Sequence, residues 1–82
     1  MTIAINRKKL LDIYRKELLY ELHKASECIK LFEKKYGKSF KEFEEEIKSK
    51  PEDFEVWDDY MEWKACIKSA ESLKEELKEL EN

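Results

Sequence analysis

The chain has 82 residues, of which 45% are charged and 41% hydrophobic, and its formal net charge is −3. This length corresponds to one small domain over residues 1–82, and the apolar share excludes a disordered polar chain. The 17 basic and 20 acidic residues are intermingled, no stretch reaches the ~20 apolar residues of a membrane span, and the N-terminal MTIAINRKK lacks a signal-peptide core. We therefore expect a cytoplasmic protein that binds neither nucleic acid nor membrane.

An apolar stripe predicts a first helix over about residues 6–36. Asn6 suits the N-cap, and Gly37 suits the left-handed position that follows a helix. A sparser second strip on this helix contains Leu10, Ile13, Tyr20 and Leu31. The main stripe recurs at steps of three and four and consists of Leu11, Tyr14, Leu18, Leu22, Ala25, Ile29, Phe32 and Tyr36.

A short second helix is predicted over about residues 40–48. Ser39 and Glu42 form a capping box, in which each side chain bonds the backbone amide of the other residue. Phe40, Phe43 and Ile47 then fall on one side. A helix of about nine residues is not stable alone in water, so it must pack against another element.

The third helix is predicted over about residues 52–80, with Pro51 at its start. Two long helices joined by a short segment should pack antiparallel, which gives an all-α helical hairpin with a short helix at the bend. Such a hairpin buries one face of each helix, so we expect two copies to pair as a two-fold dimer, a four-helix bundle. The main stripe of this helix consists of Val56, Tyr60, Trp63, Ile67, Ala70, Leu73, Leu77 and Leu80.

A second apolar strip lies on the other side of the third helix and contains Phe54, Trp57, Met61 and Ala65. One interpretation is that this strip is the bed for the short helix. The other is that it binds a partner, because Trp, Tyr and Met are enriched in protein interfaces. The two interpretations are compatible if the short helix covers part of the strip.

The sequence contains no recognisable catalytic, metal or cofactor site, so we expect a protein that is not an enzyme. His23 is the sole histidine, and with Glu27 it is too little for a metal site. Cys28 and Cys66 are expected to be small buried side chains in a reducing cytosol. Antiparallel helices would bring them within a turn of each other, so a disulfide is the alternative. The abundance of Lys and Glu is also typical of hyperthermophile proteins, although an AT-rich genome would raise the Lys content by itself.

Two stretches, KKYGKSFKEFEEEIKSK (34–50) and FEVWDDYMEWKA (54–65), resemble a family of small helical proteins of archaea and cyanobacteria. That family is similar to the antitoxin halves of toxin–antitoxin modules, the TumA-like partners of TumE-type toxins. The matching positions are Tyr36, Gly37, Ser39, Phe40, Glu42, Phe43, Trp57, Asp59, Tyr60, Glu62, Trp63 and Lys64.

The resemblance implies a non-catalytic antitoxin that binds and neutralises a cognate toxin, with no cofactor. The acidic side chains would steer it toward a basic toxin surface. The alternative function is a self-associating structural or adaptor bundle with every aromatic ring in its core, and a metal- or ligand-binding bundle built on the acidic clusters is a third. The candidate partner-binding residues are Phe54, Trp57, Asp58, Tyr60, Met61, Glu62 and Trp63.

Overall fold

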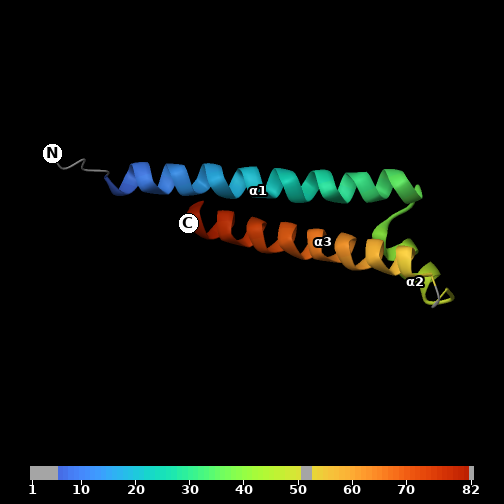
Figure 1. The fold of residues 1–82 in the computed structure, drawn as a ribbon. Coiled ribbons are helices and arrows are strands. Elements are labelled where there is room, and N and C mark those ends of the chain that lie inside the picture. The colour runs from blue at the N-terminus through green and yellow to red at the C-terminus, as the bar shows by residue number, and fades with distance from the viewer. Residues whose placement is uncertain (1–5, 51–52, 82) are drawn as a thin grey trace.

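The structure is a computed structural model that describes residues 6–50 and 53–81. Within these residues the chain forms three helices, α1 (Arg7–Tyr36), α2 (Phe40–Ile47) and α3 (Phe54–Glu81). α1 and α3 are the two antiparallel arms of a hairpin, and α2 lies at the bend (Figure 1). The predicted all-α hairpin is therefore confirmed. The roles expected of Pro51 and residue 52 lie outside the described residues.

The expected caps close both ends of α1. The Asn6 side chain accepts a hydrogen bond from the Lys9 amide at 2.8 Å. At the other end Gly37 has φ 62° and ψ 30°, and its amide donates to the Glu33 carbonyl at 2.8 Å. A side chain at this left-handed position would strain the backbone, so Gly37 is the residue that ends the helix here.

Side chains cap the N-terminal ends of α2 and α3, the two helices that start at the bend. The Glu42 amide donates to the Ser39 hydroxyl at 3.2 Å, as predicted, whereas the Glu42 carboxylate accepts from the Ser39 hydroxyl at 3.1 Å rather than from the predicted amide. α3 begins after Asp53, whose carboxylate accepts from the Val56 amide at 3.2 Å. These bonds satisfy amides that would otherwise have no partner in a first helical turn.

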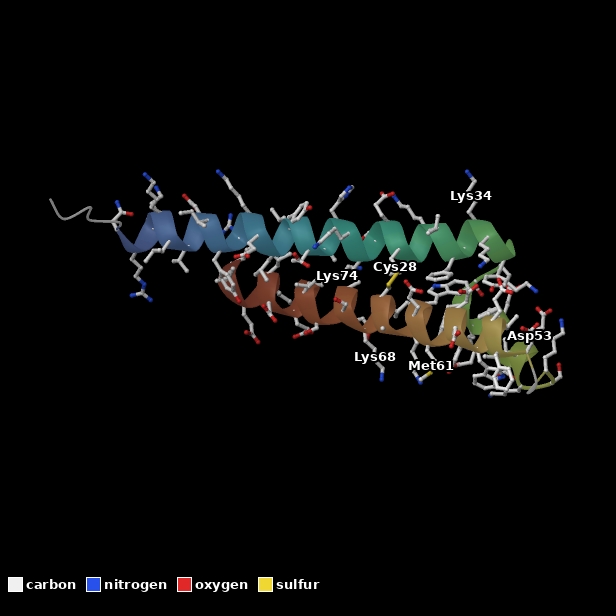
Figure 2. The ribbon with its side chains drawn as sticks, in the orientation of Figure 1. Cys28, Lys34, Asp53, Met61, Lys68 and Lys74 are labelled. Atoms are coloured by element: carbon white, nitrogen blue, oxygen red, sulfur yellow. A yellow bond between two sulfur atoms is a disulfide. The ribbon has the colours of Figure 1, made fainter. Side chains whose placement is uncertain are left out.

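The long arms pack closely where their side chains are small. Ala25 of α1 and Ala70 of α3 are both buried at this interface. Beside them, Cys28 and Cys66 form a disulfide with their Cα atoms 6.3 Å apart, visible as the yellow bond in Figure 2. The expectation of two unpaired thiols is wrong, because the antiparallel pairing brings the two half-buried cysteines together.

α2 lies at the bend beside the N-terminal part of α3 (Figure 1), and its Phe43 also contacts Tyr36 at the end of α1. Its buried side chains, Phe43 and Ile47, form one core cluster with Phe32 of α1 and Trp63 of α3.

The interpretation that the second strip of α3 is the bed for α2 is borne out only at Trp57, which packs against this cluster, whereas Phe54 and Met61 stay exposed. α2 packs mainly against the stripe that also faces α1. The physical reason is that Tyr60 and Trp63 on that stripe provide large rings against which Phe40 and Phe43 pack.

The main stripe of α1 is not buried along its whole length. Leu11 and Tyr14 are each 44% exposed, although both were expected in the interface. The N-terminal end of α1 extends past the C-terminal end of α3 (Figure 1), so α3 covers this part of the stripe incompletely.

Adjacent leucines of α1 provide a test of the core assignment. Leu18 is 5% exposed and Leu19 is 49% exposed. We expect Leu18→Ala to lower the free energy of unfolding by about 2–5 kcal/mol, since it removes packed methyl groups and leaves a cavity. The control Leu19→Ala should change it by about 0.5 kcal/mol or less. Urea titrations of both variants measure this, and equal losses would contradict the assignment.

The disulfide provides a second test. Reduction should lower the free energy of unfolding by about 2–5 kcal/mol, because the bond closes a long loop in the unfolded chain. A thermal melt with and without reductant measures the loss. The Cys28→Ser/Cys66→Ser variant should melt at the temperature of the reduced protein and should not respond to reductant. Free thiols in the purified, non-reduced protein, detected by alkylation and mass spectrometry, would contradict the bond.

Candidate partner-binding site

The seven predicted site residues all lie in the first three turns of α3, where the structure separates them by burial. Trp63 is fully buried, at 0% exposure. Trp57 and Tyr60 are half-buried. Asp58 and Glu62 are exposed. Phe54 and Met61 are the most exposed apolar members, at 82% and 64%.

Trp63 is the centre of the core. Its indole stacks with Phe32 at 5.7 Å between ring centroids and meets the edge of Phe40 at 5.3 Å. Tyr36 and Phe43 approach it at 6.2 and 5.2 Å. Because the ring has no exposed surface, Trp63 is not available to a partner in this fold and is not part of the candidate site. Its Nε1 has no hydrogen-bond partner within the described part of the chain.

Tyr60 connects α3 to α2. Its ring stacks on Phe40 at 5.4 Å, and its hydroxyl donates to the Glu44 carboxylate at 2.5 Å. This hydrogen bond is the main reason that the pKa of Tyr60 is raised above its ordinary value. Tyr60 is thus committed to contacts inside the protein on two sides, and it supports the site more than it offers surface to a partner.

Trp57 lies at the border between the core and the exposed strip. The edge of its indole meets the Tyr60 ring at 5.5 Å, and its Nε1 donates to the Lys50 carbonyl at 3.3 Å. These contacts fix the orientation of the indole and leave part of it exposed. Trp57 can therefore contact a partner with little loss of side-chain entropy.

The exposed part of the site is an apolar strip with acidic neighbours. Phe54 and Met61 are two turns apart on one face of α3, and Met61 projects on the side away from α1, as Lys68 does (Figure 2). Asp58 and Glu62 lie on the same turns and are exposed. We call this set the α3 outer surface; it consists of Phe54, Trp57, Asp58, Met61 and Glu62.

A hydrogen-bonded network that the sequence analysis did not assign to the site lies on the inner side of the same turns. Asp59 accepts from the Lys35 ammonium at 2.6 Å and from the Tyr36 hydroxyl. The Lys35 bond, followed by the Tyr36 bond, lowers the pKa of Asp59, while burial and the Asp59 bond raise the pKa of Tyr36. The network joins the last turn of α1 to α3. The predicted antiparallel pairing of the two long helices was the signal in the sequence that could have revealed this network.

The remaining chemistry of the described residues is sparse. Residues 6–50 and 53–81 contain no group of three or more His, Cys, Asp or Glu side chains placed to hold a metal ion. Among the same residues, no helix combines the length and apolar character needed to cross a bilayer. What the site offers chemically is an apolar contact surface with carboxylates beside it.

Comparison with protein families identifies the family to which the chain belongs. The model of the uncharacterized protein MJ0235 family matches residues 3–82. The chain belongs to this family. No curated protein and no solved structure matches it. The family description names no activity, ligand or partner, so a function has to be argued from the geometry.

The Asp59 network predicts how stability depends on pH. Because the pKa of Asp59 is lower in the fold, its carboxylate stabilises the protein above about pH 4, and this contribution is lost as the pH falls further. The pKa of Tyr36 is raised, so its contribution is present below about pH 10 and is lost as the pH rises above that value.

We expect Asp59→Asn to lower the free energy of unfolding at pH 7 by about 1–3 kcal/mol, since the bonds from Lys35 and Tyr36 lose their charged acceptor. The variant should also lose less stability than the wild type below pH 4. Asp58→Asn, at the neighbouring exposed position, is the matched control and should behave like the wild type. Urea titrations between pH 3 and pH 11 measure these differences; coincident curves for Asp59→Asn and Asp58→Asn would contradict the role of Asp59.

Proposed function

We propose that this protein is a non-catalytic binding protein that neutralises a protein toxin by covering part of its surface. The observation that carries the proposal is the exposure of Phe54 and Met61 on one face of α3, at 82% and 64%. The alternative, an adaptor bundle with every aromatic ring in the core, leaves the exposure of Phe54 without explanation.

The apolar side chains of the α3 outer surface supply the contacts that bind proteins most tightly. A Phe, a Trp and a Met lie together there, and Trp and Met are enriched in interfaces. Isolated exposed apolar side chains need no explanation. Here, however, they share one face of a helix, as in complexes where a helix inserts its apolar side chains into a groove of the partner.

The charges of the surface indicate the kind of partner. Asp58 and Glu62 flank the apolar strip and are exposed, and Asp53 lies at the start of the helix. Acidic side chains around an apolar centre favour a partner with a basic surface and accelerate encounter with it. A toxin that cleaves RNA would carry such a surface. The resemblance of residues 34–50 and 54–65 to TumA-like antitoxins supports a TumE-type toxin as this partner.

The site is also held rigidly. Trp57 is fixed by its contacts with Tyr60 and Lys50, and the same turns of α3 are tied to α1 through Asp59. A pre-organised surface loses less conformational entropy on binding than a flexible one. The toxin would therefore bind to a preformed face of α3. We expect this binding to take place in the cytoplasm and to need no cofactor.

Co-expression with the neighbouring open reading frame tests the proposal. We expect that neighbour to arrest growth when expressed alone, and we expect this protein to restore growth and to co-purify with it. A neighbour that neither arrests growth nor binds this protein would contradict the antitoxin role.

The surface itself is tested with Phe54→Ala/Met61→Ala in the same assay. Each apolar side chain in the centre of an interface contributes roughly 1–4 kcal/mol, so the double variant should weaken binding at least about 30-fold and lose the rescue of growth. Leu19→Ala, a truncation of an exposed apolar side chain on α1, is the control and should bind normally. Circular dichroism should be unchanged in both variants. Normal binding by the double variant would show that the partner uses another surface.

A further inference from the structure

α1 carries a second apolar face that no part of the described chain covers. Leu10, Ile13, Tyr20 and Leu31 are each between 51% and 66% exposed. At 100° per residue these four positions fall on one face of the helix, apart from the buried stripe of Leu18, Ala25 and Phe32. We call this face the α1 outer strip. It lies on the opposite arm of the hairpin from the α3 outer surface.

The solvent-accessible surface area of the molecule is larger than that expected for a compact protein of the same mass. The structure measures 62 × 27 × 18 Å and has a solvent-accessible surface of 6831 Å². A compact monomer of 10.0 kDa is expected to have about 5,200 Å². The surplus, roughly 1,600 Å², reflects the elongated shape of the hairpin. Pairing with a second copy, at the ~800 Å² per partner of a standard interface, would remove part of this surplus.

The charges on the α1 outer strip are complementary to those of a second copy in the antiparallel orientation. Glu17 and Lys24 lie on the same face, between the apolar pair Leu10 and Ile13 at one end and Leu31 at the other. In an antiparallel pair, Leu10 of one copy meets Leu31 of the other, and Glu17 meets Lys24. The two-fold axis then passes near Tyr20, and each attractive contact occurs twice. A surface that complements itself in this way is what a two-fold dimer requires.

We propose that two copies of this chain pair through the α1 outer strip as an antiparallel two-fold dimer, with each Glu17 beside Lys24 of the partner copy. The pairing covers the four apolar side chains of the α1 outer strip and brings four long helices together. It does not involve Phe54 or Met61, so it is independent of the toxin-binding proposal and can be tested on the protein alone.

Charge exchange across the interface tests the proposal by sedimentation equilibrium. The wild type should be a dimer at micromolar concentration. Glu17→Lys places two lysines together at both symmetric contacts and should weaken dimerisation about tenfold or more; Lys24→Glu should have the same effect. The double variant Glu17→Lys/Lys24→Glu should restore the dimer, because the exchanged charges attract again.

Matched controls separate this effect from a change in net charge. Glu75→Lys and Lys68→Glu alter exposed charges on α3 by the same amounts and should leave the dimer intact. Leu31→Glu, at an exposed apolar position of the strip, should give a monomer with unchanged helicity by circular dichroism. A monomeric wild type at 100 μM would overturn the proposal. A dimer that resists both Glu17→Lys and Leu31→Glu, or a double variant that remains monomeric, would also overturn it.

Discussion

The burial of the Trp63 indole among rings from the other two helices holds the described fold together. Phe32 and Tyr36 come from α1, and Phe40 and Phe43 from α2, so one side chain of α3 joins all three elements. An eight-residue helix such as α2 has little stability of its own. It is helical here because Phe43 and Ile47 are buried against this cluster.

The core also determines which apolar side chains remain outside. α3 has apolar side chains on two faces, and the face that contains Trp63 is covered by both α1 and α2. Nothing in the described residues is left to cover Phe54 and Met61 on the other face. Tyr60 and Trp57 lie between the two faces and are bonded to Glu44 and Lys50. The proposed toxin-binding surface is thus a consequence of how α2 packs.

The two proposed interfaces use different arms of the hairpin. The α1 outer strip would meet a second copy, and the α3 outer surface would meet a toxin. In the proposed dimer each copy would keep its own α3 outer surface, so the assembly would present two toxin-binding sites. The disulfide between Cys28 and Cys66 joins the two arms that carry these surfaces.

The sequence alone determined the helices, the caps of α1, the Ser39 cap of α2 and the antiparallel pairing, because these depend on the spacing of apolar residues and on local residues such as Asn6, Ser39 and Gly37. The Asp53 cap of α3 was not predicted. The sequence also located the stretch that contains the candidate site. The tertiary structure decided which aromatic rings of that stretch are buried. Spacing shows that α3 has two apolar faces, but it does not show which face α2 covers. That choice depends on the combined volume of rings from α1, α2 and α3, which only the folded arrangement brings together, and the pairing of Cys28 with Cys66 depends on the same three-dimensional contact.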